Sequence, residues 1–271
     1  IDTRLPLRDA VREAFRKPQP VYVRWPHILG ILAFVVFLFQ GVTGMFLAFY
    51  YQPSPDAAYE SFLIITRDVH LGWYLHQMHG WGSHILIGLL LLRLCRVFFH
   101  RAYRSPRELV WILGVLLTLA AIYLGITGSA LPWDQESYWS FTRCTETIRQ
   151  LPVLGAIFGF FIGGYDMGRF VLPRLYVLHI MALPILMMVL FYFHFATIRR
   201  IGLSRMSDKT VPERPLYPDH LLNLLTILVL LFGIILTLSV LLPSLTTGQA
   251  DAYTSYPGAM PPWYMLPALG M

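Results

Sequence analysis

The chain of 271 residues is 56% hydrophobic and 13% charged, and its formal net charge is +6 at pH 7. About a quarter of the residues of a soluble domain are charged, so this composition excludes an ordinary soluble protein and favours an integral membrane protein. The positive charge gathers in loops between apolar segments, which indicates membrane topology and not nucleic-acid binding.

The first segment, residues 1–27, predicts an amphipathic helix that lies on the cytoplasmic surface of the membrane. Its apolar and basic residues fall on different helical faces: Leu7, Val11, Ala14 and Phe15 on one, and Arg8, Arg12 and Arg16 on the other. A plain solvated basic arm is the alternative interpretation.

Five later stretches are long and apolar enough to cross a bilayer core, which takes roughly 20 residues of helix. They lie at 28–51, 80–99, 109–131, 176–198 and 221–242. Lys and Arg are concentrated in the N-terminal arm and in the loops that follow the second and fourth stretches. By the positive-inside rule, these segments and the N-terminus face the cytoplasm.

The connections at 52–78 and 132–175 are then on the outer side, as is the segment 243–271. The second connection contains an apolar stretch at 153–164 that is too short to span and is expected to be interfacial or re-entrant. Cys95 and Cys144 fall in no metal-binding or haem-attachment pattern. A disulfide framework, a structural metal site and a covalent c-type haem are therefore disfavoured.

Histidines inside the apolar stretches point to function, because ionisable side chains are costly within a bilayer. His179 and His194 are 15 residues apart, which is about 22 Å along a helix and within about 60° of one face. His79, in the second stretch, is expected at the depth of His179. This pair would ligate one haem iron between two helices, whereas His84 has no obvious partner.

Glycines recur at the same two depths. Gly30 and Gly44 are 14 residues apart in the first stretch, as are Gly114 and Gly128 in the third. That spacing returns to nearly the same helical face after about 21 Å. Each helix would then offer a smooth surface to a cofactor at both depths, and ordinary close packing of membrane helices is the alternative.

Several short motifs occur in a fixed order along the chain. They are Gln40-Gly41-Val42-Thr43-Gly44, Pro106-Arg107-Glu108-Leu109, Leu131-Pro132-Trp133-Asp134-Gln135 with Tyr138-Trp139, Arg174 five residues before His179, and Tyr217-Pro218-Asp219-His220. With these motifs the chain resembles the cytochrome b subunit of bc-type quinol oxidoreductases, most of all the short split form that pairs with a separate small subunit.

The resemblance implies an all-α integral membrane fold with a haem-binding four-helix bundle at 28–200. A segment at 201–271 would add a fifth transmembrane helix and an outer loop. The implied iron ligands are His79, His179 and His194, and the other implied cofactor-binding residues are Arg93, Arg174, Gly30, Gly44, Gly114 and Gly128. A quinol site is implied on the outer side, walled by residues 132–135 and by the loop after the fifth helix.

Arg93 departs from the family pattern, because it stands where the second span of the family has its second histidine ligand. Arginine keeps its proton and is a poor iron ligand. The inner haem would be five-coordinate on His194, ligated by a partner subunit, or absent. Because Gly30 and Gly114 are retained, we expect a second haem b with unusual ligation. Arg93 would bind a haem propionate or an anionic lipid, with simple snorkelling as the alternative.

Pro262 is the second departure, in a Pro261-Pro262-Trp263-Tyr264 segment where the quinol-site motif of the family carries glutamate. Quinol oxidation releases two protons and needs an acceptor, which proline cannot provide. We therefore place the catalytic residues at Asp134, Glu136 and Tyr264, with one of the two carboxylates as the substitute acceptor. A purely structural role of Asp134 as a helix cap is the alternative.

The predicted function is that of a b-haem subunit of a respiratory or photosynthetic complex in an energy-transducing membrane of the bacterial inner type. It would pass electrons between quinone and partner subunits such as a Rieske-type protein, a multihaem cytochrome c, or another iron–sulfur protein. A non-catalytic membrane anchor is the alternative. A transporter with a histidine proton relay is disfavoured, since haem-spaced histidines do not serve a relay.

Overall fold

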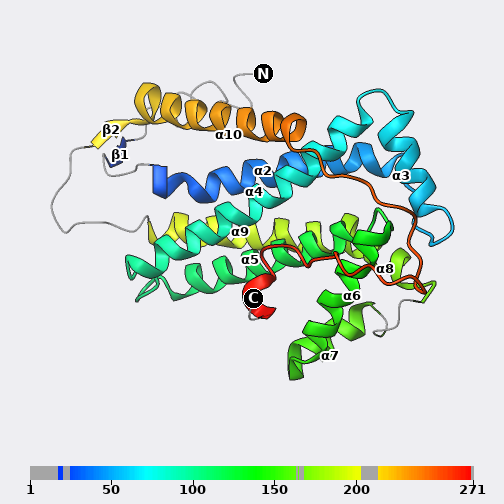
Figure 1. Cartoon of the computed structure of the whole chain (residues 1–271). Helices are drawn as coiled ribbons and strands as arrows, with labels where there is room; N and C mark the ends of the chain where they lie inside the picture. The colour runs from blue at the N-terminus through cyan, green and yellow to red at the C-terminus, as the bar shows by residue number, and fades with distance from the viewer. Residues whose placement is uncertain (1–17, 21–24, 163, 165–167, 203–212, 270–271) are drawn as a thin grey trace, which may run out of the picture.

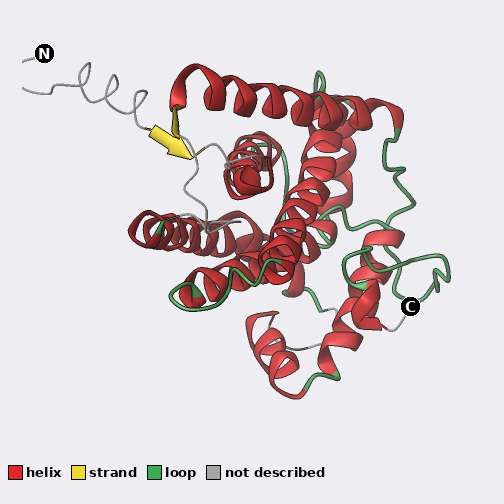
Figure 2. Ribbon diagram, turned by 90° about the vertical axis from the view of Figure 1, so that its left-hand side faces the viewer, coloured by secondary structure: helices red, strands yellow, loops and turns green. Residues whose placement is uncertain are grey.

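The computed structural model describes residues 18–20, 25–162, 164, 168–202 and 213–269. The predicted amphipathic arm lies almost wholly outside these residues. The described part of the chain is built of helices joined by loops, with one short pair of strands at an edge (Figures 1 and 2).

Within the described residues, five helices are long and apolar enough to cross a membrane. They are α2 (Trp25–Ala48), α4 (Gly72–Phe99), α5 (Glu108–Ser129), the continuous run of α8 (Val171–Val177), η1 (Leu178–Ala182) and α9 (Leu183–Ile201), and α10 (Leu221–Leu241). A bilayer core offers no partners for backbone polar groups, so apolar segments satisfy them internally as helices. The predicted all-α integral membrane fold with five spans is confirmed.

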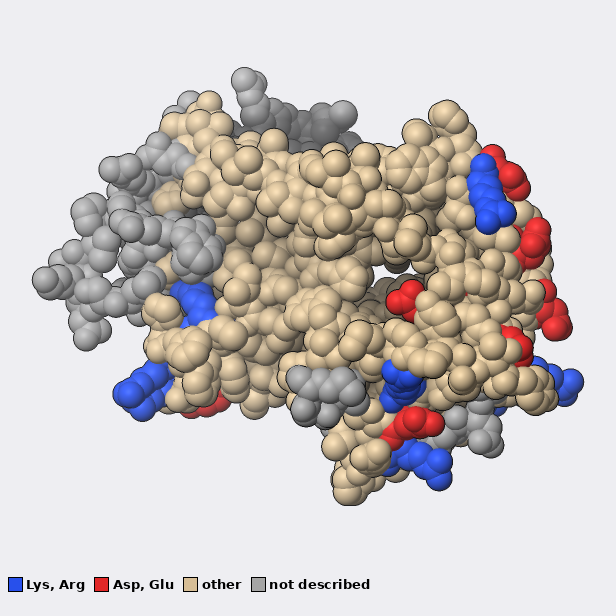
Figure 3. Space-filling model, in the orientation of Figure 1, with Lys and Arg blue, Asp and Glu red and all other residues tan. Residues whose placement is uncertain are grey.

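The long helices form a bundle of four, with the fifth beside it. Helix α2 packs on α4, α4 on α5 and α5 on α9, while α10 packs mainly on α4. The interior is apolar, with Val36, Ile87 and Met187 among its fully buried residues. Charged side chains gather toward the two ends of the molecule and leave an uncharged band between them (Figure 3). This band has the character of a surface that faces lipid.

Helix α4 begins eight residues earlier than predicted, at Gly72 and not at residue 80. Its first two turns mix aromatic and polar residues, so hydropathy does not detect them although their backbone is helical. These two turns and the next one hold the chain that leaves α10. The Gln77 side chain exchanges hydrogen bonds with Ser244, and Trp81 Nε1 donates to the carbonyl of Leu242 at 2.9 Å.

A widened π turn, η1, interrupts the fourth span and contains His179. Pro184 follows it and has no N–H to donate to the carbonyl four residues earlier. A π turn shifts the residues before it around the helix axis relative to those after it. The face shared by His179 and His194 is therefore not the one that a uniform helix predicts.

The outer end of the bundle carries shorter helices: α3 (Ala58–Arg67), α6 (Gln135–Arg149) and α7 (Pro152–Ile162). A further short helix, α11 (Leu266–Leu269), follows where the C-terminal segment runs back along the bundle (Figure 1). Helix α7 coincides with the apolar stretch that was expected to be too short to span, and it has 11 residues. Its interfacial or re-entrant position stays a prediction.

The opposite end joins segments that are far apart in the sequence. Strand β1 (Pro18–Pro20) pairs antiparallel with β2 (Glu213–Pro215), and η2 (Leu216–His220) leads from β2 into α10. The Arg107 side chain donates to the carbonyl of Gly202 at 2.8 Å. Strands β1 and β2, Arg107 and Gly202 thus lie at one end of the bundle. That this end is cytoplasmic stays a prediction.

Asp134 holds the outer end together through both of its carboxylate oxygens. Oδ1 accepts the backbone N–H of Ser137 at 2.9 Å and the Ser137 hydroxyl accepts the N–H of Asp134, which forms a capping box at the start of α6. Oδ2 accepts the N–H of Thr247, in the segment after α10, at 3.0 Å. The predicted alternative role of this residue as a helix cap is present in the structure.

We expect Asp134→Ala to destabilise the protein by about 1–2 kcal/mol, because loss of an N-cap carboxylate costs roughly that much. The temperature of unfolding of the purified protein in detergent should fall, while Asp134→Asn, which keeps an acceptor for Ser137, should lose less. Glu136→Ala is the control, since its exposed side chain lies in the same turn. Equal unfolding temperatures of wild type and Asp134→Ala would contradict the capping role.

Candidate functional site

Two histidines face each other between α4 and η1. The ring centroids of His79 and His179 are 6.1 Å apart and their planes are inclined at 72°. Both imidazoles are half-buried, whereas the apolar residues around them are mostly buried. The structure thus brings the predicted outer pair together without direct bonding between the two rings.

Two threonines orient these rings. The Thr43 hydroxyl of α2 donates to the carbonyl of Phe39 at 3.0 Å and lies 2.8 Å from His79 Nδ1, so it accepts the N–H of that nitrogen. His179 Nδ1 lies 3.1 Å from the carbonyl of Leu124 and 3.2 Å from the Thr127 hydroxyl of α5. Both rings therefore carry a proton on Nδ1, which in the neutral tautomer leaves the lone pair of Nε2 for a ligand.

Two glycines allow the helices to approach these rings. A Cβ atom added at Gly44 would lie 3.0 Å from Cε1 of His79, and one added at Gly128 would lie 2.5 Å from Cε1 of His179. Each glycine follows the orienting threonine, in the segments Gly41-Val42-Thr43-Gly44 and Gly125-Ile126-Thr127-Gly128. The sequence-based prediction found the glycines and missed the threonines, although this four-residue repeat marks both.

The outer pair suits axial ligation of a haem iron. Iron-bound imidazoles use one ring nitrogen for the metal and donate the other N–H to a backbone carbonyl or side chain, which fixes their orientation. His79 and His179 both meet this requirement through Nδ1. The residues at this depth fit the group that the histidine and glycine spacing predicted.

The inner pair has a different arrangement. Arg93 Nη2 donates to His194 Nε2 at 2.7 Å, and the exposed fractions of the two residues are 7% and 1%. His194 Nδ1 is buried and has no hydrogen-bond partner among the described residues. Gly30 and Gly114 both lie against the Arg93 side chain. This set does not fit haem ligation, because the Nε2 lone pair is engaged and a guanidinium has none to offer.

The segment after α10 returns to the bundle at its outer half. Trp263 Nε1 donates to His84 Nδ1 at 3.2 Å, and the ring of Tyr264 lies 6.3 Å from that of His84. The Tyr264 hydroxyl lies against Gly125 of α5. Burial, and to a smaller extent the nearby Cys144, raises the pKa of Tyr264 above its usual range. His84, which had no predicted partner, thus contacts the predicted quinol-site segment.

The two predicted carboxylates, Asp134 and Glu136, differ in burial and in hydrogen bonding. Asp134 is buried and both its oxygens accept backbone N–H groups, whereas the Glu136 side chain is exposed. Partial burial and the neighbouring Asp134 raise the pKa of Glu136. Within the described residues, no hydrogen bond or ring contact joins either carboxylate to Tyr264. The structure therefore leaves Glu136 as the more available proton acceptor of the two.

Arg174 lies in the middle of α8. Its Nη1 atom donates to the carbonyl of Ile162 at 3.2 Å, and its guanidinium lies 5.9 Å from the ring centre of Phe170. These contacts join α8 to the end of α7. A contact of Arg174 with a cofactor stays a prediction.

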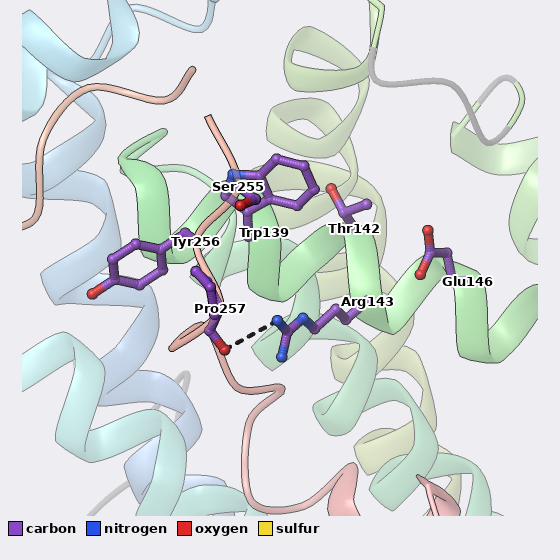
Figure 4. Close-up of a pocket in the computed structure, with 7 residues that line it drawn as sticks. All are labelled: Trp139, Thr142, Arg143, Glu146, Ser255, Tyr256 and Pro257. Atoms are coloured by element: carbon purple, nitrogen blue, oxygen red, sulfur yellow. Dashed lines mark hydrogen bonds between the residues drawn. The ribbon is translucent and has the colours of Figure 1, made fainter. Parts of the chain in front are cut away.

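A small pocket of about 290 Å³ lies where the C-terminal segment crosses α6 (Figure 4). It is lined by Trp139, Thr142, Arg143, Glu146, Ser255, Tyr256 and Pro257. Arg143 donates to the carbonyls of Pro257, at 3.2 Å, and of Ala259. The pocket shows how α6 positions the segment that carries Tyr264.

Comparison with known proteins places this arrangement in a family. A family model described as cytochrome b/b6/petB matches residues 14–202, which include the His79–His179 and Arg93–His194 pairs. The chain belongs to the cytochrome b family. It is 35% identical to cytochrome b6 of Tupiella akineta and 36% identical to that of Synechococcus sp. (strain JA-3-3Ab); each match covers 75% of this chain and 95% of the relative.

A solved structure described as hyperthermophilic respiratory Complex III is also similar. It is 27% identical with a TM-score of 0.87, and the match covers 98% of this chain and 73% of that one. The family model ends at residue 202, whereas the structural match extends over most of the remainder. The likeness therefore includes α10 and the outer segment that follows it.

Family membership and fold make the chain a b-haem membrane subunit of a quinol oxidoreductase complex, in which it works with other subunits. The resemblance predicted from the histidine, glycine and Pro-Trp-Asp-Gln motifs is confirmed. The number of haems and the identity of their ligands depend on the His79–His179 and Arg93–His194 pairs, which differ in their geometry.

We expect Gly128→Ala to lower the haem content of the purified protein severalfold, because its Cβ would collide with the ring of His179. Gly41→Ala is a matched control in the first Gly-x-Thr-Gly segment, since nothing lies within 4 Å of a Cβ at that position. Haem per chain is measured as the pyridine haemochrome. Equal haem content in the two variants would show that the close approach at Gly128 is not required.

Proposed function

We propose that His79 and His179 are the axial ligands of a b haem in the outer half of the bundle, and that quinol is oxidised beside it. The observation that carries this proposal is the matched orientation of the two rings by Thr43 and Thr127. Haem b changes between ferric and ferrous states and so supplies a one-electron acceptor. The protein contributes the ligands, their orientation and an apolar setting that tunes the haem potential.

The proposed quinol site lies where the segment 261–264 meets the bundle. Its supporting features are the contacts of Trp263 and Tyr264 with α4 and α5, and the hydrogen bond that Asp134 accepts from the N–H of Thr247, which ties the same outer segment to α6. Oxidation of one quinol to quinone releases two electrons and two protons. We infer that Glu136 accepts a proton there, because Asp134 is committed to capping.

The proposed function also implies which partner subunits the chain binds and how it is oriented in the membrane. Electrons would leave for a Rieske-type, multihaem cytochrome c or other iron–sulfur subunit that docks at the outer end. The basic loops, and with them the N-terminus, would face the cytoplasm of an energy-transducing membrane of the bacterial inner type. Labelling of Cys95, an exposed thiol near one end of α4, with an impermeant reagent in oriented vesicles tests this topology.

The central experiment is reduction of the purified haem protein by a quinol analogue, followed in the visible spectrum. Rapid reduction that a quinone-site inhibitor blocks supports the proposed function. Haem that dithionite reduces and quinol does not would identify the alternative, a non-catalytic membrane anchor of a redox complex.

His179→Ala should abolish the outer haem, because among the described residues of the fourth span no other histidine lies at that depth. His84→Ala is the control, since His84 bonds to Trp263 and does not face His179. The measurements are haem per chain and the low-spin signal in paramagnetic resonance. An unchanged low-spin signal in His179→Ala would disprove the assigned ligand.

The rate of quinol oxidation should rise with pH as Glu136 loses its proton, because only the carboxylate accepts a proton. Since the pKa of Glu136 is raised, this rise should occur at a higher pH than for an ordinary glutamate, whose pKa is about 4.3. Glu136→Gln should remove this step from the profile and slow the reaction by roughly 10²-fold or more. The control is Glu146→Gln, which changes another exposed glutamate ten residues further along α6. An unchanged pH profile in Glu136→Gln would exclude Glu136 as the proton acceptor.

A further inference from the structure

The two depths of the bundle have equivalent frames with different contents. At the outer depth, Gly44 faces His79 and Gly128 faces His179. At the inner depth, Gly30 and Gly114 both face the one side chain of Arg93. At the outer depth, the space beside the two glycines is thus filled by two separate imidazoles. At the inner depth, the corresponding space is filled by the single guanidinium of Arg93.

Arg93 fills the inner frame from α2 to α9. A Cβ at Gly30 of α2 would lie 3.6 Å from its Nε, and its Nη1 is the nearest atom to a Cβ at Gly114 of α5. Its Nη2 reaches His194 of α9 at 2.7 Å. Each of the three guanidinium nitrogens therefore points to a different helix of the bundle.

The inner pair is closed and the outer pair is open. His79 and His179 are half-buried with 6.1 Å between ring centroids. Arg93 and His194 are in direct hydrogen-bond contact and almost completely buried. A ligand seated between the inner residues would have to break their hydrogen bond. Breaking it would leave a buried guanidinium with no acceptor among the described residues, which is strongly unfavourable.

We propose that Arg93 and His194 close the inner haem position of the family fold, so that this chain binds a single b haem at its outer depth. The inference rests on the proposed ligation by His79 and His179. It replaces the sequence-based expectation of a second haem with unusual ligation. The donor set explains the difference: Arg93 has no lone pair for iron, and its hydrogen bond occupies the lone pair of His194 Nε2.

The test is haem stoichiometry in the purified full chain, by pyridine haemochrome against protein concentration, with paramagnetic resonance for the spin state. Wild type should contain one low-spin haem per chain. His194→Leu should keep that haem. Arg93→His restores a histidine opposite His194 and should raise haem content about twofold, with a second low-spin signal. Arg96→His is the matched control, three residues further along α4, and should keep one haem.

Two haems per chain in wild type would overturn the proposal and would show that Arg93 turns aside, for instance to pair with a haem propionate. Loss of haem in His194→Leu, or an unchanged single haem in Arg93→His, would also overturn it. Failure of the proposed outer ligation would have a different signature. The His179→Ala variant would then keep its haem, or the wild-type protein would contain no haem.

Discussion

The placing of two imidazoles between four membrane helices is the constraint on which the rest of the bundle depends. His79 and His179 come from α4 and η1, but the groups that orient them belong to α2 and α5. Each orienting threonine is followed by a glycine whose missing side chain lets its helix contact the ring. One Gly-x-Thr-Gly segment thus sets both the direction of a histidine and the distance between two helices. Because a bilayer offers no water to repair a misplaced polar group, ring orientation and helix packing have to be satisfied together.

The outer surface of the site is held by side chains that hydrogen-bond to backbone groups, in addition to apolar packing around Trp133 and Tyr138. Asp134 caps α6 and also accepts the N–H of Thr247, Gln77 exchanges hydrogen bonds with Ser244, and Arg143 binds carbonyls of the segment before Tyr264. These contacts bring a segment from beyond the fifth helix back to α4 and α5. They also explain why Asp134 is a weak candidate for proton transfer: protonation of its carboxylate would loosen the wall of the site that it would serve. An exposed carboxylate two residues on, Glu136, carries no such structural duty.

Much of the fold could be predicted from the sequence, because apolar length and the positions of Arg and Lys report directly on the bilayer. The five spans and the depth shared by His79 and His179 are of this kind. The early start of α4, the β1–β2 pairing and the π turn around His179 could not be predicted, since each depends on contacts between distant segments or on local backbone bonding that hydropathy does not contain. The same holds for the site. Spacing identifies Gly30 and Gly114, but only the packed structure shows that both face Arg93 and that His84 receives Trp263.

The contrast between the two ends of the bundle bears on how the complex would conserve energy. A polar pair that is hydrogen-bonded and buried is costly to separate, so loss of either Arg93 or His194 alone would destabilise the inner half. A single outer haem would receive electrons from quinol and give them up at the same end of the membrane, and the two protons of the quinol would also leave at that end. The chain's own residues would then carry no charge across the bilayer. Any transmembrane movement of charge would have to come from a partner subunit or from a second quinone reaction outside this chain, which makes the identity of the docking partner decisive for the physiology of the complex.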